Sequence, residues 1–298
     1  MALFRVLVTT KLTVSHTFIV DGVATDAAGD AVTGTLKRLD GTAVGAVLNA
    51  TKTATGKYAV ALPASAVLDA WSLDWAGTVA GSAVVIRDYV EHAGGFLFDI
   101  GAARAAHRTT ANPWNSARYS DDFLVAKRTA VEQEAEAIAH TAFVPRFARV
   151  ALDGSGTDSL VVPDMDLRAV RSVKVADGYG QPYTALGAGE LAAVAPLDSG
   201  VLVRDDGSTW PRGRRNVIAE YEYGQDYTPT EVSDSAIMRL RYMVSSTRTS
   251  IPDRAISYTI LEGGVYRMAQ AGKRSTGSPD IDAAYQRHGN ETFWLAAR

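Results

Sequence analysis

The chain has 298 residues, 47% of them hydrophobic, and a formal net charge of −3. This length and apolar content are sufficient for two domains with separate cores. The charge excludes a broad basic surface that would attract nucleic acid by neutralising phosphates along the whole molecule. Because the sequence contains no cysteine, disulfides and thiolate metal sites are excluded as well.

The first residues show no targeting segment. Met1 to Arg5 contain no basic stretch followed by an apolar core. No apolar run in the sequence approaches the roughly 20 residues of a membrane-spanning helix. We therefore expect a soluble chain that is not processed at its N-terminus.

Residues 1–95 are predicted to form an antiparallel β-sandwich of the immunoglobulin-like type. Apolar residues alternate with period two in segments such as 57–62 and 71–75, which is typical of strands with one buried face. Turn sequences such as Asp40-Gly41 separate the segments at short spacing, as antiparallel strands require.

Trp71 and Trp75 allow two interpretations. Exposed aromatic side chains on a sandwich could form a platform on which sugar rings stack. The two tryptophans, however, share one strand face with Leu73, and so apolar a face in a two-sheet domain is typical of the core. We predict that all three side chains are buried.

The composition changes near residue 95, where a stretch rich in Thr, Val, Ala and Gly gives way to charge pairs typical of helices. We therefore divide the chain into an N-terminal domain, residues 1–95, and a second domain, residues 96–298. Residues 96–118 are predicted to be a structured connector between the sandwich and the first long helix.

That helix is predicted over residues 120–143. Ser120 is a suitable N-cap, and Asp121 and Asp122 place negative charge in the first turn, where the helix dipole favours it. Pro145 is expected to end the helix. Apolar residues recur along one stripe of it, as in an amphipathic helix.

Glu132, Glu134 and Glu136 lie mostly outside this apolar stripe. Two carboxylates one turn apart could act as general acid and base, but they are more typical of a solvated helix face or of charge between subunits. We predict that the three glutamates contribute to contacts between subunits, because an amphipathic helix flanked by charge commonly forms such interfaces.

The remaining elements complete an α+β fold. We predict a β-rich region, containing a small antiparallel sheet, over residues 145–224 and a helix over residues 231–247. A hairpin and a short helix follow within residues 254–290, where Ser278 and Pro279 supply a cap and a first-turn proline.

The order of these parts resembles the head-to-tail adaptor proteins of long-tailed phages that infect actinobacteria. The resemblance covers roughly residues 96–290, and its specificity lies in the order and spacing of short segments. The segments are Ala142-Phe143-Val144-Pro145-Arg146-Phe147-Ala148-Arg149, Leu152-Asp153-Gly154-Ser155-Gly156-Thr157, Leu167-Arg168-Ala169-Val170-Arg171-Ser172-Val173, Trp210-Pro211-Arg212-Gly213-Arg214-Arg215-Asn216-Val217, Glu220-Tyr221-Glu222-Tyr223-Gly224 and Ile251-Pro252-Asp253-Arg254-Ala255.

The resemblance implies a structural virion protein at the head-tail interface, assembled in the host cytoplasm, with no catalysis and no cofactor. Such a protein forms a dodecameric ring beneath the portal protein, extends the channel through which double-stranded DNA passes without sequence readout, and meets the next tail-side connector or stopper protein. The N-terminal domain would decorate the outside of the ring or reach the major capsid protein. The family core is often a small helical bundle, whereas this chain is rich in predicted strands.

Family members typically grip the portal with a C-terminal arm, so the resemblance places the portal contact in residues 254–290. The apolar and aromatic residues of this arm are the expected contacts. They are Tyr258, Ile260, Val265, Tyr266, Ile281 and Tyr285.

Arg212, Arg214 and Arg215 form the densest basic cluster of the sequence. The guanidinium groups could line a DNA channel, since they suit phosphates, although tight phosphate capture would slow the passage of DNA. A solvated turn between two strands is the more common setting for such a cluster. We also expect these arginines to contact acidic residues of a neighbouring subunit.

No motif points to catalysis or to a metal site. The five histidines are scattered, without the one-turn spacing of a zinc-binding helix. Gly272-Lys273-Arg274 lacks the Ser or Thr and the preceding glycine of a phosphate-binding loop. The alternative to a virion protein is a soluble surface binding module with an immunoglobulin-like domain, although the sequence contains neither a signal peptide nor cysteines.

Overall fold

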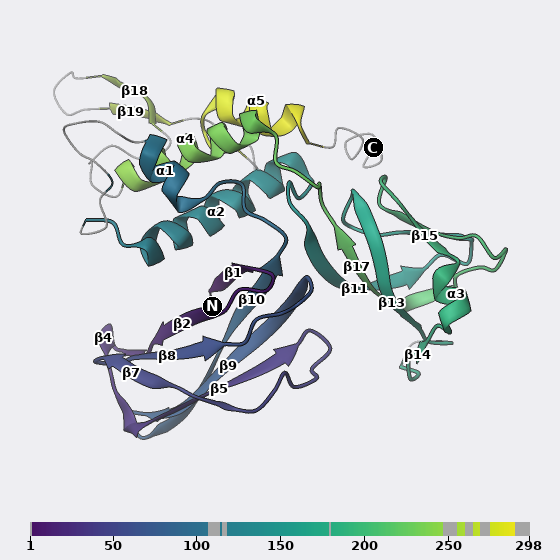
Figure 1. Cartoon of the computed structure of the whole chain (residues 1–298), viewed down its shortest axis with the longest axis horizontal. Coiled ribbons are helices and arrows are strands. Elements are labelled where there is room, and N and C mark those ends of the chain that lie inside the picture. The colour runs from purple at the N-terminus through teal and green to yellow at the C-terminus, as the bar shows by residue number, and fades with distance from the viewer. Residues whose placement is uncertain are drawn as a thin grey trace.

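The computed structural model describes residues 2–106, 114, 118–178, 180–246, 255–259, 265–268 and 275–289. The predicted α+β class is confirmed. The elements form three packed groups, which are the N-terminal sandwich, a layer of helices and a second β group (Figure 1). Each group surrounds a hydrophobic core of its own.

The N-terminal sandwich consists of two main sheets that share one core. One sheet has the order β1-β10-β9-β5-β6 and the other the order β2-β8-β7. The strands are β1 (Leu3–Leu7), β2 (Leu12–Thr17), β3 (Ile19–Val20), β4 (Val23–Ala24), β5 (Ala27–Arg38), β6 (Leu48–Asn49), β7 (Thr51–Ala54), β8 (Lys57–Leu62), β9 (Asp69–Val79) and β10 (Ser82–Ala93). Trp71, Leu73 and Trp75 on β9 are buried between the sheets, which confirms the core interpretation.

One pairing departs from the predicted antiparallel pattern. β1 lies parallel to β10, with Leu3 opposite Tyr89 and Leu7 opposite Ala93. The whole intervening sandwich joins these two strands, so no hairpin constrains them to be antiparallel. The division of the chain at residue 95 stays a prediction; the last strand of the sandwich ends at Ala93.

The helical layer covers one side of the sandwich. It contains α1 (Ile100–Ala106), α2 (Asp121–Ala139), α4 (Thr230–Ser246) and α5 (Pro279–Arg287). Helix α2 lies between the sandwich and the pair formed by α4 and α5 (Figure 1). Among the described helices, none combines the length and the hydropathy of a bilayer-crossing segment.

Helix α2 begins as predicted but ends earlier than expected. The Ser120 hydroxyl accepts a hydrogen bond from the Phe123 backbone N–H, at 3.3 Å, as an N-cap does. The helix ends at Ala139, because His140 adopts a left-handed backbone conformation with φ 55°. This conformation, and not Pro145, ends the helix.

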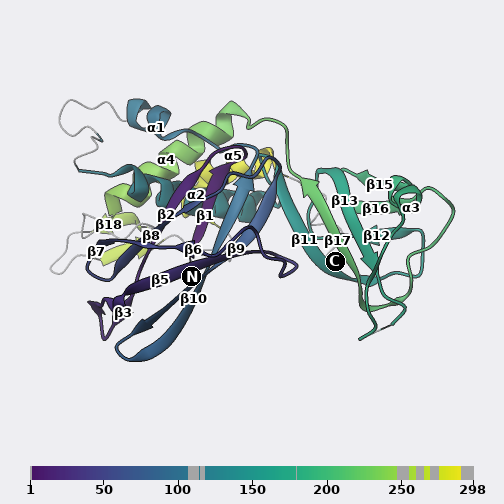
Figure 2. The same cartoon turned by 60° about the horizontal axis from the view of Figure 1, so that its bottom comes forward.

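The second β group lies beside the sandwich and the helices, at one end of the molecule (Figure 1, Figure 2). It comprises two sheets, with the orders β11-β17-β13-β14 and β12-β16-β15, where a single small sheet was predicted. Its elements are β11 (Arg146–Gly154), β12 (Ser159–Val161), β13 (Leu167–Val175), β14 (Thr184–Ala185), α3 (Ala188–Ala192), β15 (Val194–Leu197), β16 (Val201–Arg204) and β17 (Gly213–Tyr223). Trp210 and Tyr221 are fully buried in its core.

The predicted C-terminal hairpin corresponds to β18 (Ala255–Thr259) and β19 (Val265–Met268), which pair antiparallel. The short helix predicted after Ser278 is α5, and Pro279 occupies its first turn. Helix α5 packs against both α2 and α4, so this part of the predicted arm belongs to the helical layer.

Candidate functional site

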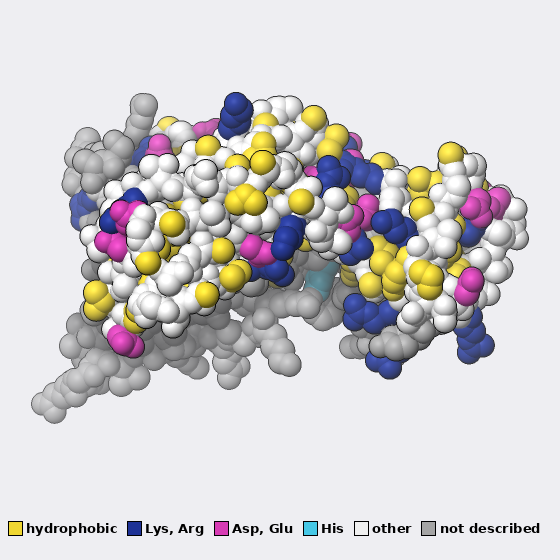
Figure 3. All heavy atoms as spheres, turned by 90° about the horizontal axis from the view of Figure 1, so that it is seen from below, with side chains coloured by type: hydrophobic (Ala, Val, Ile, Leu, Met, Phe, Trp, Pro, Cys, Tyr) yellow, Lys and Arg dark blue, Asp and Glu magenta, His cyan; other side chains and the backbone are white. Residues whose placement is uncertain are grey.

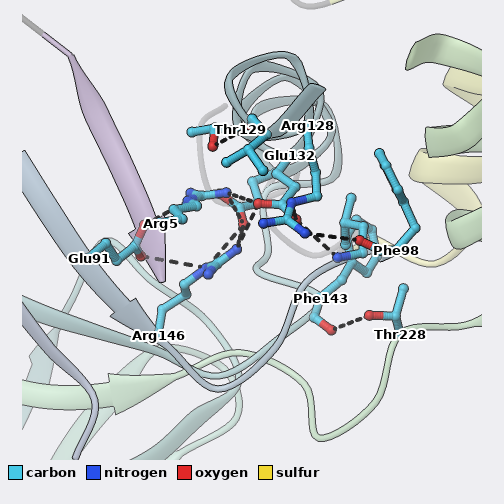
Figure 4. Close-up of polar contacts among 12 residues, drawn as sticks. Arg5, Glu91, Phe98, Arg128, Thr129, Glu132, Phe143, Arg146 and Thr228 are labelled. Atoms are coloured by element: carbon cyan, nitrogen blue, oxygen red, sulfur yellow. Dashed lines mark hydrogen bonds and ion pairs between the residues drawn. The ribbon is translucent and has the colours of Figure 1, made fainter. Parts of the chain in front are cut away.

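Six charged side chains meet where the sandwich, helix α2 and strand β11 converge (Figure 4). We call them the junction cluster. They are Arg5 of β1, Glu91 of β10, Arg128, Glu132 and Glu136 of α2, and Arg146 of β11. Three arginines and three glutamates cancel in formal charge, so the cluster introduces no net charge into the interior.

Arg5 joins the sandwich to α2. Its Nε lies 2.6 Å from Oε2 of Glu91. One terminal nitrogen lies 2.6 Å from Oε2 of Glu136, and the other lies 3.1 Å from Oε2 of Glu132. The guanidinium of Arg5 therefore uses all three nitrogens on carboxylates from two groups of the fold, which suits the fixed fork of arginine donors.

Arg146 connects β11 to the same carboxylates. Its side chain is fully buried, and its Nη2 lies 2.8 Å from Oε1 of Glu136. Its Nε lies 3.5 Å from Oε1 of Glu91. Glu91 and Glu136 thus each contact two arginines, and all three groups of the fold meet in one network.

Glu132, like Arg146, has a side chain with no exposed surface. Besides its arginine contacts, its Oε1 accepts a hydrogen bond from the Leu97 backbone N–H at 3.1 Å. Arg128, one turn before it, lies over the Phe96 ring with 3.4 Å between its guanidinium carbon and the ring centre. This contact is a cation–π arrangement, and it holds the connector after β10 against α2.

The two glutamates of α2 respond to this environment in opposite directions. Burial raises the pKa of Glu132 and prevails over the opposing charges of Arg146 and Arg5. Burial also acts to raise the pKa of Glu136, but the charges of Arg146 and Arg5 and their hydrogen bonds prevail and hold that pKa below its usual range. The folded chain therefore favours the ionised form of Glu136 and disfavours that of Glu132.

The interpretation of the three helix glutamates as a solvated face is corrected. Glu132 is buried and Glu136 belongs to the junction cluster, while Glu134 pairs with Arg239 of α4 at 2.6 Å. An apolar stripe marks only one buried face of a helix. Helix α2 has the sandwich on one side and α4 and α5 on the other, so charged residues outside the stripe are also buried. A fully buried Glu132 does not reach a neighbouring subunit.

The only sequence signal for the cluster is weak. Arg5 is the single charge within the apolar strand Leu3–Leu7, and a lone charge in a strand with buried positions needs a partner. The partners are up to 131 residues away in sequence, so no local pattern could identify them.

Ile281 and Tyr285, predicted to contact a portal, are buried in the helical core, with exposures of 1% and 0%. Their side chains pack inside this subunit and are not presented to a partner. Tyr258, Val265 and Tyr266 lie in β18 and β19, and their role as portal contacts stays a prediction. Ile260 lies outside the described residues.

Arg212, Arg214 and Arg215 are exposed. Arg212 lies in the connection between β16 and β17, as predicted for a turn between two strands. Arg214 and Arg215 do not, because β17 already begins at Gly213; they lie where β17 bulges out of register with β11. Within the described part of the chain, none of the three forms an ion pair. Lys and Arg side chains are also visible on the face of the second β group in Figure 3.

A pocket of about 570 Å³ lies at the opposite end of β17, next to the helical layer. Its lining is mostly polar. The lining residues are Asp166, Leu167, Arg168, Asp198, Gly224, Gln225, Asp226, Tyr227, Pro229 and His288. Among the described residues there is no group of three or more acidic or histidine side chains arranged to hold a metal ion.

Comparisons with known proteins give limited similarity. No family model and no curated protein matches the chain. A chain from the neck of an empty gene transfer agent (GTA) particle is 13% identical, with a TM-score of 0.39, over 50% of this chain and 78% of that chain. A chain from the virion of the native GTA particle is 15% identical, with a TM-score of 0.40, over 52% of this chain and 80% of that chain. At these values the similarity does not by itself define the class of the protein.

Proposed function

We propose that this chain is a structural protein of the neck of a phage-like particle, a head-to-tail adaptor that forms a ring beneath the portal. The observation that carries the proposal is the location of the segments that resemble phage adaptors. All of them except residues 251–255 lie in the neighbouring strands β11, β17 and β13 or in the turns and approaches at the ends of these strands. Segments scattered over more than eighty positions therefore form one continuous part of the molecule.

The junction cluster supports a role in assembly. A ring closes only if each subunit presents its two contact surfaces at a fixed rotation to one another. Arg5, Glu136 and Arg146 tie the sandwich, α2 and β11 together through contacts of 2.6–2.8 Å. Buried ion pairs add little net stability compared with apolar contacts. We propose that this cluster instead fixes how the sandwich, α2 and β11 are oriented relative to one another.

The proposed partners are the portal protein on the head side and the next connector or stopper protein on the tail side. The ring would extend the channel for double-stranded DNA, without reading its sequence. Strands β18 and β19, with Tyr258 and Tyr266, are the proposed portal contact. The sandwich would lie outside the ring or reach the major capsid protein.

Negative-stain imaging of the protein mixed with purified portal rings tests this proposal. We expect an additional annulus on one end of the portal. Portal rings that remain bare at a large excess of this chain would contradict the proposal and favour a soluble immunoglobulin-like binding module. The Tyr258→Ala and Tyr266→Ala variants are expected to reduce the fraction of decorated portals if β18 and β19 form the contact.

A further inference from the structure

The turn that carries the three exposed arginines is held firmly on both sides. Trp210, before them, is fully buried and donates a hydrogen bond from its indole N–H to the Asp158 carbonyl at 3.0 Å. Asn216, after them, is also fully buried; it donates to the Pro211 carbonyl at 2.9 Å and accepts from the Gly154 N–H at 2.8 Å. The arginine backbone is therefore ordered before any partner binds, which lowers the entropic cost of binding.

This segment carries three positive charges, those of Arg212, Arg214 and Arg215. The carboxylate of Asp153 accepts a hydrogen bond from the Arg215 backbone N–H at 2.7 Å. All four residues are exposed. We call residues 212–215, which lead from the connection after β16 into the first residues of β17, the basic turn.

The pocket at the other end of β17 has the opposite character. Asp166, Asp198 and Asp226 contribute three negative charges to its lining, and Arg168 contributes a positive one. Arg168 is paired with Asp226, and the side chain of Asp226 nevertheless remains 77% exposed. The lining thus has an excess of negative charge and carboxylate oxygens that solvent can reach.

Other groups of the pocket suit an arginine side chain in particular. Tyr227 is 75% exposed, so its ring offers a face on which a guanidinium can stack. Gln225 and the carboxylate of Asp198 provide acceptors for the planar set of guanidinium donors. A volume of about 570 Å³ is large enough for more than one such side chain.

The basic turn of a subunit cannot fill its own pocket. The two features lie at opposite ends of β17, which has 11 residues, and at a rise of about 3.3 Å per residue they are separated by roughly 35 Å. The turn of a second copy has no such restriction. A surface that binds a different surface of the next copy generates a ring if the rotation closes.

We propose that the basic turn of one copy of this chain docks in the acidic pocket of the next copy. This inference rests on the proposed function and names the contact between neighbouring subunits of the ring. Arg212 and Arg214 would pair with Asp198 and Asp226 of the neighbouring subunit and stack on its Tyr227.

Matched charge reversals test the contact. A turn variant carries Arg212→Glu and Arg214→Glu, and a pocket variant carries Asp198→Lys and Asp226→Lys; both leave Arg215, with its positive φ of 47°, unchanged. Each variant alone brings like charges together in the contact, so we expect at least about tenfold weaker self-association by mass photometry. An equimolar mixture restores both charge pairings and is expected to assemble with the two variants alternating.

A control variant with Lys11→Glu and Arg241→Glu makes the same change in net charge as the turn variant at exposed positions of the sandwich and of helix α4, and it is expected to assemble like the wild type. Circular dichroism checks that all variants fold. Suppose that the wild type forms rings. If the turn variant then forms rings equally well, or if the mixture of variants does not recover assembly, the proposed contact is disproved and the adaptor function stands. If the wild type forms no ring, either alone or on the portal, both are disproved.

Discussion

At the scale of single residues, the junction cluster is the least expected feature of the chain. Glu132 and Glu136 are one turn apart on α2 and contact the same arginines, yet their pKa values shift in opposite directions. The difference arises because Glu136 receives short contacts from both Arg5 and Arg146, whereas the nearest arginine contact of Glu132 is 3.1 Å. Desolvation therefore dominates at Glu132 and pairing dominates at Glu136.

This difference predicts unequal costs of neutralising the two carboxylates. Glu136→Gln removes a charge that folding favours, and we expect it to lower the free energy of unfolding at pH 7 by about 2–3 kcal/mol. Glu132→Gln removes a charge that folding disfavours, so its cost is expected to be at least about 1 kcal/mol smaller. Urea denaturation measures both. Asp177→Asn, at an exposed position, is the control and should stay within about 0.5 kcal/mol of wild type.

The lowered pKa of Glu136 also predicts a dependence on pH. The ordinary value of this group is 4.5, and its value in the folded chain is lower. Its stabilising contribution is therefore complete above pH 4.5 and is lost as the pH falls through the folded-state pKa. We expect the difference in unfolding free energy between wild type and Glu136→Gln to shrink as the pH decreases below 4.5. A difference that stays constant down to the acid limit would show that the charge of Glu136 is not favoured by folding.

At the scale of elements, local patterns in the sequence predicted the helices and strands well. The cap at Ser120, the proline at Pro279 and the alternation around Trp75 correspond to α2, α5 and β9. These signals depend on neighbours in sequence, because capping and one-sided burial are local. The parallel pairing of β1 with β10 and the burial of α5 depend on distant contacts, and no local pattern contains them.

The burial of α5 predicts that Tyr285 acts in stability and not in portal binding. Its ring is fully buried against the helical core, near the Phe143 ring. Tyr285→Ala is expected to lower the free energy of unfolding by about 3–5 kcal/mol. Its hydroxyl has no hydrogen-bond partner among the described residues, so Tyr285→Phe should preserve or increase stability.

Thermal or urea denaturation of the two Tyr285 variants checks this prediction. Tyr242→Ala on α4, at a position that is 46% exposed, is a matched control with a small expected effect. Unchanged unfolding of Tyr285→Ala together with weaker portal binding would restore this residue to the proposed portal contact.

At the scale of the whole molecule, charge is arranged in two ways. The junction cluster is internal and balanced, and it fixes the sandwich, α2 and β11 relative to one another. The basic turn and the acidic pocket are external and unbalanced, and they lie at opposite ends of β17. The sequence predicts Arg212, Arg214 and Arg215 as a subunit contact, whereas the acids of the pocket come from separate segments that only the fold brings together.

Because the proposed contact is exposed and ionic, assembly is expected to depend on salt. Screening at about 1 M ionic strength acts over about 3 Å, compared with about 10 Å at 0.1 M. We expect rings to dissociate as sodium chloride is raised over this range, while the buried junction cluster keeps each subunit folded. Analytical ultracentrifugation with parallel circular dichroism separates the two effects. Rings that persist unchanged in 1 M salt would indicate an apolar interface instead.

The central claim is that this chain forms the ring of a head-to-tail adaptor. Mass photometry of the wild-type protein, alone and with purified portal rings, tests it most directly. We expect one discrete multimer whose mass is a multiple of 31.7 kDa, seen either free or as an increase in the mass of the portal ring. A single species of 31.7 kDa at all concentrations, with an unchanged portal mass, would contradict it.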